Sequence, residues 1–147
     1  MLAWIRPHSF DFPLFLHVLG AMILVGATTA AVVCELASAR SPAPERMRAL
    51  AARIFLVVAL PAYIVMHAAA EWIHSKEFPK GVDDPTWIGI GYIAADAGGL
   101  VLLVSIVLAG IASWKAKPGL GRAAGILAAI ALVGWLVAVW AMGAKPT

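Results

Sequence analysis

Four long apolar blocks, at about residues 12–38, 49–73, 87–113 and 120–142, leave little chain for anything else. Each block reaches or exceeds the roughly 20 residues that an α-helix needs to cross about 30 Å of hydrocarbon. The mean hydropathy of +0.92 also lies far above that of soluble domains. The sequence therefore predicts an all-α integral membrane protein, in which residues 1–147 form a single domain with four transmembrane helices.

The basic residues predict how these helices are oriented. The first connection carries Arg40, Arg46 and Arg48, and Arg53 lies just inside the next helix. The third connection carries only basic charges, at Lys115, Lys117 and Arg122. The middle connection mixes both signs (Lys76, Glu77, Lys80, Asp83 and Asp84). By the positive-inside rule, the first and third connections face the cytoplasm. Tryptophans near the helix ends fit the same placement, because Trp prefers the membrane interface. We expect an N-out, C-out, up-down-up-down four-helix bundle.

Ionisable side chains at membrane depth are the strongest functional candidates, because each costs about 2.5–3.5 kcal/mol on insertion scales. The candidates are few: His17 and Glu35 in the first helix, His67, Glu71 and His74 in the second, and Asp96 in the third. At 1.5 Å per residue, His17 and His67 both lie roughly 6–9 Å below the outer surface. Two imidazoles at one depth on neighbouring helices suit a shared cofactor, because bundle cores build such sites from facing helices.

A haem b with His17 and His67 as axial ligands is the first interpretation. Gly20, Ala70 and Tyr63 lie beside the two histidines, and their small or flat side chains would let the porphyrin ring approach the helices. Asp96 on the third helix would accept a hydrogen bond from the N–H of a ligand histidine. The alternative is that the two histidines hydrogen-bond to each other, to a carbonyl or to Asp96 and only hold helices together. The small residues would equally serve close helix packing.

A metal ion is the competing interpretation. His67, Glu71 and His74 are spaced i, i+4, i+7 and share one helix face, so with His17 they could bind copper or zinc. "EWIH" matches the Glu-x-x-His of di-iron bundles, but those sites need a second such motif and further glutamates, which the sequence lacks. Alternatively, Glu71 and His74 lie in the solvated interface that Trp72 marks.

Other features of the chain narrow the function. The basic residues lie at helix ends rather than in one patch, which argues against nucleic-acid binding. No nucleophile–base set or phosphate loop occurs, and Cys34 alone cannot form an internal disulfide. We expect Pro61 to kink the second helix and Glu35 to pair with Arg40 or Arg53.

Two segments, "FLHVLGAMILVGATTA" at 15–30 and "YIVMHAAAEW" at 63–72, resemble small four-helix bacterial membrane proteins related to the copper-resistance D family and to cytochrome b-type bundles. His17, Gly20 and Gly26 form the core of this similarity. The resemblance implies either haem b binding in the membrane or copper handling at its outer face.

The leading hypothesis is a haem b protein of the bacterial inner membrane, active in one-electron transfer or redox sensing near the outer face. The alternatives are copper or other metal binding or transport, and a non-catalytic subunit or assembly factor of a larger complex. The sequence offers no soluble redox domain, so we do not expect a stand-alone enzyme. Besides the lipid bilayer, the partners consistent with this hypothesis are a redox protein or a quinone, and further copies or subunits of a complex.

Overall fold

The computed structural model describes residues 11–77 and 85–144, and its elements are all helical. They are α1 (Asp11–Ala37), η2 (Ser38–Arg40), α2 (Pro44–Ile54), η3 (Phe55–Ala59), α3 (Leu60–Glu77), α4 (Thr86–Trp114) and α5 (Pro118–Ala144). Because α2, η3 and α3 follow one another directly, they form one continuous span. Within the described residues, four helical spans are long and apolar enough to cross a membrane, in agreement with the four long apolar helices predicted from the sequence. The predicted N-terminal segment before Asp11 and most of the middle connection lie outside the described residues.

The second span begins earlier than predicted, at Pro44 instead of near residue 49. Pro44 occupies the start of the helix, where the missing N–H of proline costs nothing, and Glu45 in the first turn suits the positive end of the helix dipole. Arg46 and Arg48, expected in a loop, therefore belong to the helix. The hydropathy pattern placed the start of the second span too late, because the first turn and a half of this helix is polar.

The second span contains a π-helical turn, η3, where the sequence predicted a kink at Pro61. Pro61 has no backbone N–H to bond to the carbonyl four residues earlier, at Val57. The extra residue of a π turn lets the helix continue past such a missing bond, and π turns in α-helices are frequent at functional sites. The turn ends two residues before Pro61.

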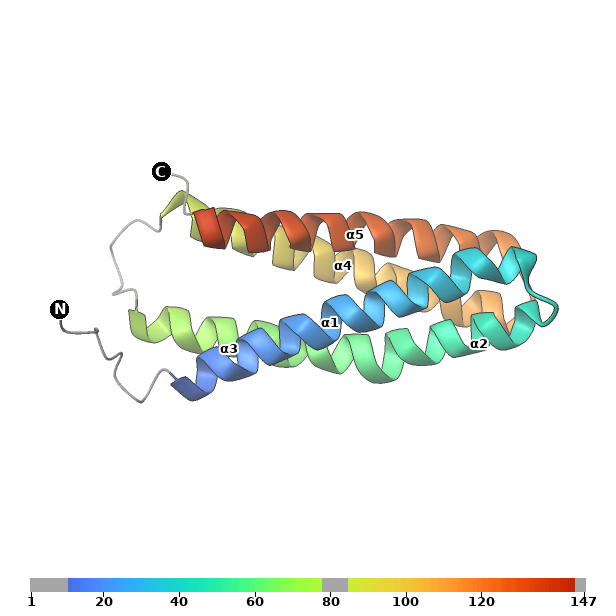
Figure 1. Cartoon of the computed structure of the whole chain (residues 1–147), viewed down its shortest axis with the longest axis horizontal. Coiled ribbons are helices and arrows are strands. Elements are labelled where there is room, and N and C mark those ends of the chain that lie inside the picture. Colours follow the sequence, from blue (N-terminus) through green and yellow to red (C-terminus); the bar gives the residue numbers. More distant parts are fainter. Residues whose placement is uncertain (1–10, 78–84, 145–147) are drawn as a thin grey trace.

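The spans form two pairs that separate toward one end of the bundle (Figure 1). α4 packs along α5, and α1 packs on α3 and crosses to α5, whereas α3 and α4 contact each other only sparsely. We call the end where α1 begins and α5 ends the terminal end, and the end with η2 and the α4–α5 junction the opposite end (Figure 1). The bundle is thus closed at the opposite end and looser at the terminal end.

Small residues make the close helix contacts. The buried face of α5 consists almost wholly of glycine and alanine, as expected where lipid supplies no hydrophobic drive and helices associate by close packing (Gly121, Ala124, Gly125, Ala128, Ala131, Trp135, Ala138, Ala141). Among larger side chains, Leu24, Phe55 and Leu102 are completely or almost completely buried.

Candidate functional site

A cavity of about 340 Å³ lies inside the bundle toward the terminal end. All four spans line it, and most of its walls are apolar. His17, His67 and His74 are among the lining residues, so the cavity brings together three of the histidines that the sequence singled out. A largely apolar cavity with a few convergent polar groups is the usual form of a ligand or cofactor site.

His17 has a fixed ring orientation. Its Nδ1 lies 3.0 Å from the backbone carbonyl oxygen of Met66 on α3. A carbonyl can only accept, so Nδ1 carries the proton, and in the neutral imidazole Nε2 keeps its lone pair. Metal-ligating histidines commonly donate their other N–H to a carbonyl in this way. The same hydrogen bond also connects α1 to α3, as expected if His17 only holds the two helices together.

His67 lies between an aromatic ring and a carboxylate. Its ring stacks on Tyr63, with the centroids 5.6 Å apart, and its Nε2 lies 3.9 Å from Oδ1 of Asp96 on α4. This distance is within ion-pair range but too long for a hydrogen bond. The Tyr63 hydroxyl donates to the carbonyl of Ala95 at 3.3 Å, so Tyr63 spans the gap between α3 and α4. The structure therefore brings Tyr63 and Asp96 to His67, but neither to His17.

Gly20 and Ala70 have different surroundings. Ala70 lines the cavity. Gly20 instead faces the α3 backbone: a Cβ atom there would lie 2.9 Å from the nitrogen of Met66. The missing side chain of Gly20 thus lets α1 and α3 approach each other, which is the helix-packing alternative for this residue.

Glu71 and His74 do not converge with the other two histidines on one point. Glu71 is exposed, and His74 makes an edge contact with Tyr92 at 5.5 Å between centroids. Across the described parts of the chain, no three His, Cys, Asp or Glu side chains lie close enough together to hold a metal ion. The four-residue copper or zinc site stays a prediction without support from the geometry.

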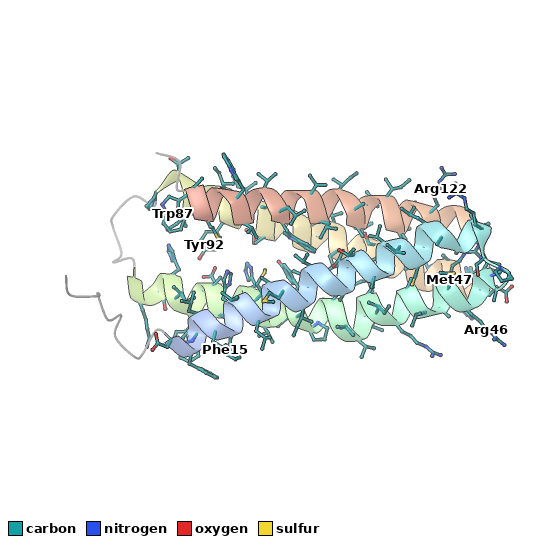
Figure 2. The ribbon with its side chains drawn as sticks, viewed as in Figure 1. Phe15, Arg46, Met47, Trp87, Tyr92 and Arg122 are labelled. Carbon is teal, nitrogen blue, oxygen red and sulfur yellow. The ribbon has the colours of Figure 1, made fainter. Side chains whose placement is uncertain are left out.

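The sequence analysis missed the aromatic residues of the cavity wall. Figure 2 shows Trp87 and Tyr92 on α4 near the terminal end, and Trp135 on α5 also lines the cavity. Depth and charge alone do not distinguish them from aromatic residues that face lipid. The helix face that carries Tyr92 also carries Ile88, Gly91 and Ala95, because residues spaced i, i+3, i+4 and i+7 share one side of a helix. This combination of an aromatic residue with small residues on one face was the available signal in the sequence.

A second polar cluster lies away from the cavity, near the opposite end. Glu35 is only 2% exposed, and neither of its carboxylate oxygens has a hydrogen-bond partner among the described residues. Its carboxylate fits against Gly121 of α5, where any Cβ would collide with it. The positive charge that acts on Glu35 is Arg48 on α2, which is itself buried, and not the expected Arg40 or Arg53. The cluster thus joins α1, α2 and α5 and leaves the cavity outside it.

Comparison of the chain with protein-family models, with curated proteins and with solved structures finds no match. The function therefore has to be argued from the cavity and its residues alone.

Proposed function

We propose that this protein binds haem b in the cavity near the terminal end and acts in one-electron transfer or redox sensing. One observation carries the proposal: His17 and His67, predicted from matched depth alone, both line one apolar cavity inside the bundle. The fixed Nδ1–H of His17 adds support, because it leaves Nε2 as the free ligand atom. Haem, when bound, supplies an iron centre that accepts and donates single electrons.

The residues present suit such a group in their chemistry. Two imidazoles could offer neutral nitrogen ligands, and the apolar walls would keep water away from a bound ring and so tune its potential. Tyr63 stacks on the His67 ring, and Asp96 lies 3.9 Å from its Nε2. The cavity volume lies at the lower end of the about 300–1,000 Å³ usual for ligand pockets.

An absorption spectrum of the detergent-purified protein tests the proposal. We expect a Soret band in the oxidised protein and sharp α and β bands after reduction with dithionite. Metal analysis of the same sample separates the alternatives. A colourless protein with stoichiometric copper or zinc would favour metal handling, and one with neither, even after incubation with hemin, would favour a structural subunit.

We also propose that the terminal end faces outward across the bacterial inner membrane, in the N-out, C-out, up-down-up-down arrangement. The distribution of charge supports this orientation: Figure 2 shows Arg46 and Arg122 at the opposite end, away from Trp87. In this arrangement the proposed haem site lies toward the outer face, and the arginine-rich end lies in the cytoplasm.

Cysteine labelling of intact cells tests the orientation. In a Cys34→Ala background, we expect Thr86→Cys at the terminal end to react with an impermeant maleimide. Ser41→Cys at the opposite end should react only after the cells are opened, because the reagent cannot reach the cytoplasm. Labelling of Ser41→Cys from outside intact cells would reverse the proposed orientation.

A further inference from the structure

The seam between α3 and α4 carries carboxylates that face away from the bundle. We define the seam face as Ile64, His67 and Glu71 on α3 with Ile93, Asp96 and Leu100 on α4. The i, i+3, i+4 and i+7 spacings place each set on one side of its helix. Apart from His67, these side chains are all exposed, and Asp96 is 68% exposed.

Asp96 lies deep in the membrane. It is ten residues from the start of α4, which is about 15 Å along the helix. Since α4 has 29 residues and is longer than the hydrocarbon thickness, Asp96 lies roughly 8 Å inside the apolar layer. A carboxylate exposed to lipid at this depth is costly, and ionisable residues in transmembrane helices almost always face a partner or a water-filled space.

Contacts among the residues that the structure describes leave this carboxylate largely uncovered. His67 approaches one oxygen of Asp96, at 3.9 Å, and its own side chain is only 30% exposed. Glu71 adds a second acidic group to the same face, nearer the terminal end. Around these two acids the seam face is apolar, with Ile93 and Leu100 flanking Asp96 on α4. The seam face is therefore an exposed apolar surface with a negative centre.

From this charge pattern we propose that the seam face docks a transmembrane helix of another protein, which presents a lysine or arginine at the depth of Asp96. The cation would cover the exposed carboxylate, and the apolar flanks would pack against Ile93 and Leu100. Interhelical polar contacts of this kind stabilise association in membranes measurably. The proposal does not depend on haem, because Ile93, Asp96 and Leu100 do not line the cavity.

Designed helices provide the test. The full-length protein, with a donor dye on Thr86→Cys in the Cys34→Ala background, is reconstituted in vesicles with acceptor-labelled polyleucine peptides. One peptide carries a single lysine at the depth of Asp96, one carries it at the opposite end, and one has leucine throughout. Energy transfer should show the first peptide binding about five- to thirtyfold more tightly than the other two.

Variants of the protein make the test specific. Asp96→Asn removes the charge but keeps the shape, so we expect it to lose most of the preference for the first peptide. Ile93→Leu, on the same face, should keep the preference. Equal binding of all three peptides, or a preference unchanged in Asp96→Asn, would overturn the proposal. Self-association without peptide that disappears in Asp96→Asn would identify a second copy as the occupant and would also overturn it. Helical circular dichroism and elution volume confirm that each variant is folded.

Discussion

Replacing His17 by alanine should abolish haem binding and remove the Soret band from the purified protein, and His67→Ala should do the same. Each substitution removes an imidazole that lines the cavity, and the small alanine side chain offers no ligand in its place. His17 has the better prepared ring, because the Met66 carbonyl fixes its tautomer and its orientation. The readout is the haem-to-protein ratio after purification and after titration with hemin.

His74→Ala is the matched control for these two variants. His74 also lines the cavity but contacts Tyr92 at its edge, so its loss should leave the haem content unchanged. In a copper or zinc site built from His17, His67, Glu71 and His74, the same variant would lose metal. Loss of haem in only one of the first two variants would indicate a single histidine ligand. Full retention in both would refute the proposed site, provided that the variants keep wild-type helix content.

Gly20→Ala should destabilise the bundle and weaken cofactor binding at the same time. The new methyl group would lie 2.9–3.0 Å from the backbone nitrogen and Cα of Met66, atoms that cannot move without shifting α3. Overpacking of this kind costs about 1–3 kcal/mol. The shift would also stretch the hydrogen bond from His17 to the Met66 carbonyl, which holds the imidazole in place. Thermal unfolding in detergent and hemin titration measure the two effects.

Gly26→Ala on the same helix is the control for Gly20→Ala. A Cβ at Gly26 would have no atom within 4 Å, so the change adds no contact. Alanine is also a better helix former than glycine by up to about 1 kcal/mol, so Gly26→Ala should be neutral or slightly stabilising. If both variants unfold at the same temperature and bind hemin equally, the close contact between Gly20 and Met66 is not a constraint on the fold.

The helix predictions succeeded where composition decides the structure. The predicted bounds of α1, α4 and α5 agree with the structure within two residues at each end, because long apolar runs end at Pro, Gly or charged residues. The start of α2 was wrong because its first turns, from Pro44 to Arg48, are polar although helical. The π turn before Pro61 was also not predicted, because a proline in a helix is compatible with a kink or with a local change of helix type.

The candidate site shows the same division between local and tertiary information. Depth along a helix follows from counting residues, so the sequence could match His17 with His67. It could not tell that Gly20 faces a backbone or that Arg48 rather than Arg40 or Arg53 acts on Glu35, because rotation about the helix axis is set by packing. Trp87, Tyr92 and Trp135 were not predicted as cavity residues, because the sequence does not distinguish an aromatic residue that faces lipid from one that faces a cavity.

The sequence by itself determined that this chain has four helices long and apolar enough to span a membrane, and which polar residues lie within them. The reason is that burial in lipid demands long apolar helices and makes each ionisable exception conspicuous. Only the tertiary structure decided that the two helix pairs separate at the terminal end, that His17 and His67 share a cavity, and that Asp96 faces outward. These features depend on how the helices rotate and cross, which small residues such as Gly20 and Gly121 set through contacts distant in sequence.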